Sequence, residues 1–215
     1  MKSFKTELDL NNQQKRLCAR HAGTSRHAYN WGLALLKELL NHNKVNPTDK
    51  IKFPTAIDLH KLLVATVKVA NAWYYEVSKC APQEALRNLI KAFKRMHSCK
   101  GSGFPKFKKK NIRDTFYLEG SIKINGDKIK LPILGWVKSH ERLPSVSPKN
   151  VTISKRAEKW FIAFKLDTIA INSQLLGEPV GVDLGINALA TCSSGFVAPN
   201  PKAYRTHLTS YEVLN

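Results

Sequence analysis

Residues 121–131 read SIKINGDKIKL, and this stretch indicates what kind of fold the chain contains. Asn125 and Gly126 stand between two short segments that each contain two aliphatic side chains, residues 121–124 and 128–131. An Asn-Gly pair in this setting is a strong signal for a β-hairpin with a two-residue turn. The middle of the chain is therefore predicted to hold antiparallel strands.

Segments on both sides of this hairpin extend the prediction. Residues 151–154 and 160–166 are rich in β-branched and aromatic side chains, and residues 1–10 alternate apolar and polar side chains as a half-buried strand does. Several short strands of this kind are typical of a small β-barrel or sandwich.

Residues 11–98 instead place apolar side chains at helical spacing. Asn11 can cap a first helix, and Gly23 is expected to divide the segment up to residue 42 into two helices joined by a turn. Thr55 and Asp58 have the spacing of a capping box before a third helix. Helices that follow a first strand and precede the other strands predict an α+β fold with a helical block inserted into the β-domain.

The charge of the chain is its first functional signal. Its 215 residues contain 35 Lys and Arg against 16 Asp and Glu, which leaves a net charge of +19. A chain this basic repels itself unless a polyanion binds it, and nucleic acid is the usual polyanion. The alternative is a basic protein without such a partner. Clustering of the basic residues favours nucleic acid.

The strongest cluster lies in residues 91–113, which contain no acidic residue. Its basic residues are Lys91, Lys94, Arg95, Lys100, Lys106, Lys108, Lys109, Lys110 and Arg113. We expect these side chains to contact phosphates. Phe93, Phe104 and Phe107 lie among them and either stack on unpaired bases or anchor the segment to the core, of which we favour the anchoring role.

A fourth helix, which Ser78 is expected to cap, presents Lys79, Gln83, Arg87 and Asn88 away from its apolar stripe. These side-chain types read base edges when a helix enters a major groove. They also occur on any helix face that points to solvent, so the two interpretations remain open.

The cysteines and the hydropathy of the chain point to a reducing compartment. The four cysteines are Cys18, Cys80, Cys99 and Cys192, and none belongs to a CxxC pair. This spacing argues against a zinc site and against a disulfide framework, and favours incidental reduced thiols. Because we recognise neither a signal peptide nor an apolar stretch of membrane-spanning length, we expect a cytoplasmic location without membrane association.

Asp183 is the sharpest candidate for catalysis. It lies in residues 179–191, PVGVDLGINALAT, which we expect to form two apolar strands around Gly185. A carboxylate inside an apolar strand needs a cation or several hydrogen-bond donors, and Mg²⁺ is a suitable cation. A strand-end aspartate that accepts hydrogen bonds from a turn is the alternative.

Taken together, five segments resemble the TnpB, or OrfB, proteins of small bacterial insertion sequences, which are relatives of type V CRISPR nucleases. The segments are RHAYNWGL (26–33), VSKCAPQEALRNLIKAF (77–93), GFPKFK (103–108), KLPILGWV (130–137) and GVDLGI (181–186). Each is of modest specificity, but their order along nearly the whole chain makes the resemblance strong.

The resemblance implies a particular domain order. It assigns residues 1–10 and 99–172 to a wedge-type β-barrel, residues 11–98 to an inserted helical recognition domain with a helix-turn-helix character, and residues 178–215 to the first strands of an RNase H-like (RuvC) nuclease domain. GVDLGI resembles the first motif of that nuclease domain, which makes Asp183 the first of three carboxylates that bind two Mg²⁺ ions.

It also implies the partners. Family members hold a guide RNA derived from the transposon end and recognise a short motif in the duplex beside the target, while base pairing supplies the remaining specificity. By resemblance, Lys79 and Gln83 approach that duplex. A companion transposase encoded nearby is a further expected partner.

The chain departs from the family pattern after Asp183. The second and third carboxylates and the zinc ribbon of the family are missing, and Glu212 is the only later acidic residue. One carboxylate cannot hold two metals, so we expect a truncated protein that binds nucleic acid without cleaving it. The alternatives are a split nuclease completed by another chain, a DNA-binding accessory protein or repressor that uses no RNA, and a decayed remnant.

Overall fold

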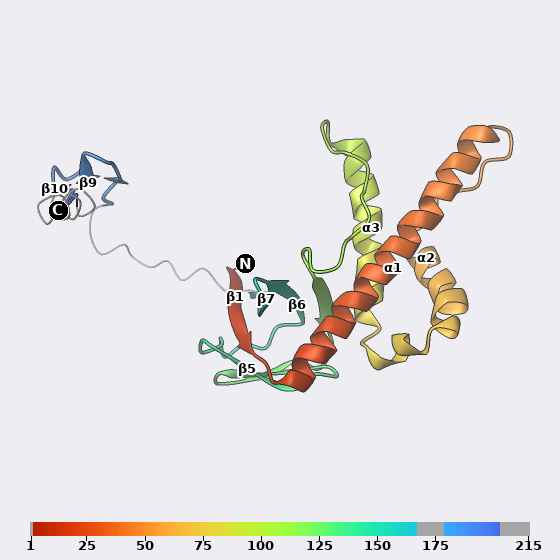
Figure 1. Cartoon of the computed structure of the whole chain (residues 1–215), viewed down its shortest axis with the longest axis horizontal. Helices are drawn as coiled ribbons and strands as arrows, with labels where there is room; N and C mark the ends of the chain where they lie inside the picture. Colours follow the sequence, from red (N-terminus) through yellow and green to blue (C-terminus); the bar gives the residue numbers. More distant parts are fainter. Residues whose placement is uncertain (1, 167–178, 203–215) are drawn as a thin grey trace, which may run out of the picture. The chain divides into compact units, whose positions relative to one another are not determined.

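The structure is a computed structural model that describes residues 2–166 and 179–202 (Figure 1). The chain divides into two compact units, Met1–Ile169 and Ala170–Asn215. The described part of the first unit contains helices and a large sheet, whereas that of the second contains a small sheet. None of the helices in these ranges combines the length and the apolar character that a membrane span requires.

A seven-stranded antiparallel sheet organises the first unit, which confirms the α+β class. Its strands are β1 (Lys2–Asp9), β2 (Thr115–Glu119), β3 (Lys123–Asn125), β4 (Lys128–Leu131), β5 (Gly135–Ser139), β6 (Asn150–Arg156) and β7 (Lys159–Leu166), in the order β2-β6-β7-β1-β5-β4-β3. The N-terminal strand β1 therefore lies in the interior of the sheet. It pairs with β7 along its length and with β5 near Leu8. Both partner strands come after all the helices in the sequence.

The expected β-barrel does not close in the part of the chain that the structure describes, because β2 and β3 end the sheet without pairing with each other. Helices cover the apolar face instead. Cys18, Ala22 and Ala81 of two helices belong to the same core cluster as the strand residues. With helices packed on it, the sheet buries its apolar side chains without closing.

Two hairpins have two-residue turns that differ in how well their residues tolerate positive φ. In the predicted hairpin, Asn125 pairs with Lys128, so the turn consists of Gly126 and Asp127 and lies one residue later than expected. Gly126 has a φ of 61°, which glycine adopts without strain. In the β6–β7 hairpin the turn residues Ala157 and Glu158 have φ values of 46° and 63°. Residues with a Cβ adopt such backbone angles only at a cost in free energy.

Helix α1 (Asn12–Val45) is one continuous helix, so the expected break at Gly23 is wrong. Asn11 caps it as predicted, in a capping box with Gln14. A lone glycine costs a helix only about 1 kcal/mol relative to alanine, which the packing on both sides of Gly23 outweighs.

The remaining helices return the chain to the sheet. They are α2 (Ala56–Leu62), the π-helical η1 (Leu63–Lys68), the 3-10 helix η2 (Ala72–Glu76) and α3 (Cys80–Ser98). The predicted capping box of Thr55 and Asp58 is confirmed. At α3 the capping position is Lys79 rather than Ser78, and the Ser78 hydroxyl accepts only a long hydrogen bond of 3.4 Å from the Cys80 N–H.

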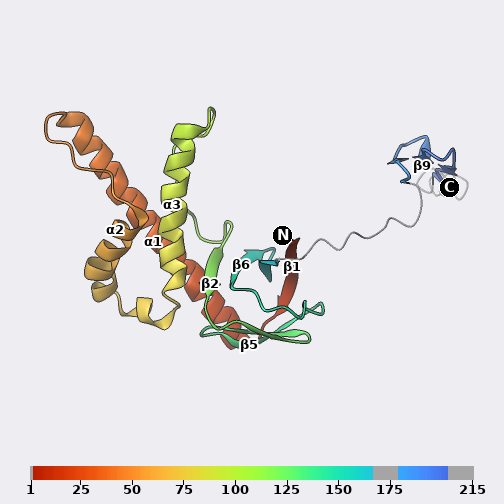
Figure 2. The same ribbon diagram turned by 180° about the vertical axis from the view of Figure 1, so that it is seen from behind.

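A second core lies among the helices, and Figures 1 and 2 both show α3 alongside α1. The two helices approach closely at Gly32 of α1. A Cβ at this position would lie 2.8 Å from Leu86 Cδ2 and 2.9 Å from Leu89 Cδ2. Only a residue without a side chain fits this contact unless the leucines move.

The described part of the second unit is a three-stranded sheet in the order β10-β9-β8. Its strands are β8 (Val182–Asp183), β9 (Ala188–Cys192) and β10 (Val197–Pro199). β8 and β9 are the two strands expected around Gly185. Their apolar side chains are largely exposed, with Val182 at 58% and Leu189 at 53%.

Candidate nucleic-acid interface

The first candidate surface is one side of α3, which carries Lys79, Gln83, Arg87 and Asn88; we call it the α3 face. Lys79, Arg87 and Asn88 are exposed and Gln83 is partly buried. Successive residues four apart lie on one side of a helix, so Lys79, Gln83 and Arg87 form a row about 12 Å long. A row of this length is compatible with contacts in a major groove.

Acidic Glu84 reduces the charge on part of this helix. Its carboxylate pairs with the Arg87 guanidinium at 3.4 Å and with the Lys91 ammonium at 3.3 Å. The basic character of the α3 face therefore depends most on Lys79, at the beginning of the helix.

Lys94 and Arg95 lie near the other end of α3, where both are exposed. The helical rise separates Lys79 from Lys94 by about 22 Å. The structure thus does not bring all the predicted binding residues together at one point. Lys94 and Arg95 lie instead where α3 leads into the following basic segment.

That segment, residues 99–114, is the basic loop, and α1 holds it in place. The Asn30 side-chain amide donates a hydrogen bond of 3.0 Å to the Lys108 carbonyl, and its oxygen accepts one of 2.8 Å from the Lys108 N–H. Arg26 of α1 pairs with Asp114 at 2.7 Å, and both side chains are largely buried. These anchors fix the loop at its middle and at its end.

The anchors divide the predicted lysines of the loop into two kinds. Lys108 points inward, with its Nζ 4.2 Å from the centroid of the Tyr29 ring, and burial lowers the pKa of its ammonium group. Lys106, Lys109 and Lys110 are exposed. The exposed lysines are better placed than Lys108 to meet phosphates.

The phenylalanines of this segment also differ from one another. Phe93 is buried and packs edge-on against Phe104, with ring centroids 5.3 Å apart, which supports an anchoring role for this pair. Phe107 is 49% exposed, and the Lys37 ammonium lies 5.3 Å from its ring centroid.

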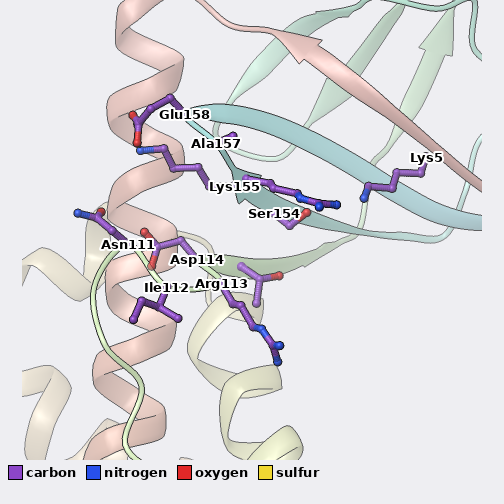
Figure 3. Close-up of a pocket in the computed structure, with 11 residues that line it drawn as sticks. Lys5, Asn111, Ile112, Arg113, Asp114, Ser154, Lys155, Ala157 and Glu158 are labelled. Carbon is purple, nitrogen blue, oxygen red and sulfur yellow. Dashed lines mark hydrogen bonds and ion pairs between the residues drawn. The ribbon is translucent and has the colours of Figure 1, made fainter. Parts of the chain in front are cut away.

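The basic loop ends in a hollow of about 770 Å³ between residues 111–115 and the β6–β7 hairpin (Figure 3). We call this hollow the basic groove. Its basic lining residues are Lys5 of β1, Arg113 of the loop, and Lys155 and Arg156 of β6. An adjoining smaller hollow of about 200 Å³ adds Lys15 and Lys110.

Acidic residues of the groove are already paired. Asp114 binds Arg26, and Glu158 binds Lys155 at 2.7 Å, a contact that Figure 3 shows beside α1. Within residues 2–166 and 179–202, no carboxylate pairs with Lys5, Arg113 or Arg156. Three cations thus line one concave surface without a compensating anion, which is the arrangement that a phosphate chain neutralises.

Sequence reasoning predicted Arg113 and Lys110 but missed Lys5, Lys15, Lys155 and Arg156. The adjacent pair Lys155 and Arg156 at the end of a strand was the available signal. Lys5 reaches the groove only because β1 pairs with β7, and this long-range register is not visible in the sequence.

Asp183 lies on β8, opposite Thr191 of β9, and its residue is exposed. The described residues around it therefore do not impose the desolvation expected for a carboxylate inside a buried strand. In the described ranges no three His, Cys, Asp or Glu side chains gather as metal ligands. These residues do not by themselves fit a Mg²⁺ centre, and the metal role of Asp183 stays a prediction.

The cysteines are unpaired among the described residues. Cys18 and Cys80 are buried, and burial raises the pKa of the Cys18 thiol to about 12. A thiol with so high a pKa is almost entirely protonated at neutral pH and is a poor nucleophile and metal ligand.

Comparison with known proteins adds a family assignment to this geometry. The family model of the OrfB IS605 helix-turn-helix domain matches residues 1–44. Within this match lie β1 and nearly all of α1. A helix-turn-helix contains two helices, whereas α1 is one continuous helix.

Similar proteins cover a much larger part of the chain. A protein of Escherichia coli named as an RNA-guided DNA endonuclease, InsQ, is 30% identical over 205 residues, which are 92% of this chain and 48% of that protein. A Mycobacterium tuberculosis protein with the same kind of name is 25% identical over 240 residues, covering 94% of this chain and 51% of its own length. The chain thus spans about half the length of these relatives.

Proposed function

Because this chain belongs to the TnpB/OrfB family of transposon-associated RNA-guided DNA endonucleases, we propose that residues 2–166 hold a guide RNA and contact duplex DNA. The basic groove is the observation that carries this proposal. Its three uncompensated cations, Lys5, Arg113 and Arg156, come from three separate segments, and the anchored basic loop leads into it.

The two basic surfaces suit two different contacts. The α3 face is a regular helical row that presents Lys79 and Gln83, which suits the edge of a duplex. The basic loop and groove offer a concave path lined by Lys and Arg, which suits the backbone of an RNA. We therefore assign the duplex to the α3 face and the RNA to the groove.

A salt series tests the groove. The affinity of the purified chain for an RNA is measured at increasing salt, and the slope of log K against log salt counts the phosphates that are neutralised. Replacing Arg156 or Arg113 with alanine should reduce the magnitude of that slope by about 0.7 for a single strand. Lys128→Ala, on the exposed side of β4, is the matched control and should leave the slope unchanged.

The use of a guide is tested by the nucleic acid that copurifies. RNA that ribonuclease removes, and that the Arg113→Ala and Arg156→Ala variants retain less well, supports a guided protein. Duplex binding without RNA supports the alternative of an unguided repressor. If the chain binds neither RNA nor DNA at low salt, the proposal is overturned.

We further propose that these 215 residues bind without cleaving. A two-metal reaction needs several carboxylates around the scissile phosphate, and Asp183 is the only acidic residue in residues 179–202. Incubation of the chain and its bound RNA with target DNA and Mg²⁺ should leave the DNA intact. Cleavage that Asp183→Ala abolishes would contradict this expectation and favour a nuclease completed by a second chain or copy.

A further inference from the structure

Two exposed aromatic side chains lie immediately before the α3 face, in η2. Trp73 is 38% exposed and Tyr75 is 65% exposed, whereas Tyr74 between them is buried at 2%. Burial of Tyr74 turns its two neighbours outward, since consecutive residues of a 3-10 helix point in different directions. We call Trp73 and Tyr75 the aromatic platform.

Several contacts fix the Trp73 side of this platform. The Tyr74 hydroxyl lies 2.9 Å from His27 Nδ1, and the His27 ring meets Trp73 edge-on, with centroids 5.1 Å apart. The indole Nε1 of Trp73 donates a hydrogen bond of 3.2 Å to Asn71 Oδ1. An ion pair between Arg20 and Glu76 ties the end of η2 to α1. Held in this way, the aromatic side chain loses little freedom when a ligand binds.

A basic side chain lies over the Tyr75 ring. The Lys68 ammonium lies 4.2 Å from the centroid of the Tyr75 ring. Lys68 also lies within electrostatic reach of His60, together with Lys79 and Arg87, because the charges of these three residues add to burial in lowering the pKa of His60. His60 is thus near Lys68, which contacts the Tyr75 ring, and near two residues of the α3 face.

We propose that the aromatic platform binds an unpaired nucleobase beside the duplex that the α3 face contacts. Inside a duplex the faces of paired bases are covered by their neighbours in the stack, so an aromatic side chain can stack there only on a base that has left it. Lys68, Lys79 and Arg87 supply positive charge for the adjoining phosphates. This inference rests on the proposed contact of α3 with duplex DNA, and it adds a site for a single strand at the end of that duplex.

The test compares a blunt DNA duplex with the same duplex carrying a short single-stranded extension, made once as DNA and once as RNA. The wild-type chain should bind an extended duplex about tenfold more tightly than the blunt one, since stacking on an aromatic side chain contributes this much per base. The DNA and RNA extensions distinguish which strand the platform takes.

Variants then locate the effect. Tyr75→Ala and Trp73→Ala should each remove most of the preference for the extension, whereas Tyr75→Phe, which keeps the ring, should retain it. Trp136→Ala is the matched control, because Trp136 is a similarly exposed aromatic residue, at 46%, on β5. Thermal melting of each variant checks that the fold is retained. Tyr75 is the decisive position because its side chain is more exposed than that of Trp73.

Tryptophan fluorescence gives an independent measurement. The extension should quench the emission of Trp73, so quenching should disappear in Trp73→Phe and persist in Trp136→Phe. Equal binding of blunt and extended duplexes, or full preference in Tyr75→Ala, overturns the platform while leaving the proposed function intact. Failure to bind either duplex overturns the proposed α3 contact itself, and the platform with it.

Discussion

His21 joins α1 to the beginning of α3: its Nε2 accepts a hydrogen bond of 3.0 Å from the backbone N–H of Ser78. Its Nδ1 lies 2.7 Å from the Leu17 carbonyl, to which it donates a hydrogen bond. The imidazole is neutral because Nε2, as an acceptor, carries no proton. The ring is fully buried and stacks on Phe116 of β2, with centroids 4.9 Å apart. One neutral side chain thus connects two helices and the sheet.

This arrangement predicts that acid destabilises the fold. Burial lowers the pKa of His21 below its usual value of 6.5, so below that pH the unfolded chain binds more protons than the folded one. The free energy of unfolding should start to fall at about pH 7.5, where the imidazole of the unfolded chain begins to bind its proton, and should decrease further towards about pH 5. Urea denaturation over this range measures the effect.

His21→Gln provides the control. It should lower stability at neutral pH, because the buried hydrogen bonds are disturbed, and it should weaken the pH dependence. Some dependence should remain, since burial also lowers the pKa values of His27 and His60. A pH dependence identical to that of the wild type would show that His21 is not the group responsible.

Two glycines of α1 predict opposite effects of the same substitution. Gly23→Ala should raise the free energy of unfolding by about 1 kcal/mol, because alanine is the better helix former and the nearest atom to its Cβ is Arg26 Nη2 at 3.9 Å. Gly32→Ala should lower it by roughly 1 kcal/mol net, because the new methyl group meets Leu86 and Leu89 below 3 Å. Chemical denaturation of both variants would reveal the difference in sign, and equal shifts would contradict the close approach of α1 and α3.

The hydrogen bonds of Asn30 predict a link between loop order and nucleic-acid binding. Asn30→Ala should cost about 1–3 kcal/mol, speed tryptic cleavage after the lysines of the basic loop, and weaken RNA binding. Asn43→Ala is a matched control, since Asn43 makes the same pair of hydrogen bonds to Ile51, both at 2.8 Å, far from the basic loop in the sequence. If both variants are cleaved equally fast in residues 99–114, the anchoring role of Asn30 is wrong.

The turn of the β6–β7 hairpin predicts a stabilising change. Replacing Ala157 with Asn and Glu158 with Gly should raise the free energy of unfolding by about 1 kcal/mol, because these residues tolerate positive φ. Glu158→Gln removes the ion pair with Lys155 while keeping the side chain, and it separates that contribution from the backbone effect. A double variant that is no more stable than the wild type would contradict the strain at this turn.

Local signals predicted local structure well in this chain. The capping residues Asn11 and Thr55 and the hairpin at Gly126 depend on neighbouring residues alone, and all three occur in the structure. Gly23 was misleading because packing of the whole of α1 against the sheet and α3 outweighs the preference of one residue.

The parts that escaped prediction depend on partners distant in sequence. Neither the interior position of β1 nor the open sheet follows from alternation of side chains, which is the same in barrels and open sheets. The basic groove needs Lys5 and Arg156 to meet across β1, β7 and β6. The aromatic platform depends on burial of Tyr74, which only the helical core reveals.

The position of β1 has a consequence for synthesis on the ribosome. Leu8 pairs with Ser139 and Trp160, which emerge long after it, whereas the contacts of α1 with α3 can form earlier. β5 can pair with one edge of β1 before β7 is made, but until β7 is complete the edge of β1 that β7 covers stays unpaired. Unpaired edges invite association between nascent chains. Translation of a messenger RNA that ends before the codons of β7 should therefore produce nascent chains that aggregate.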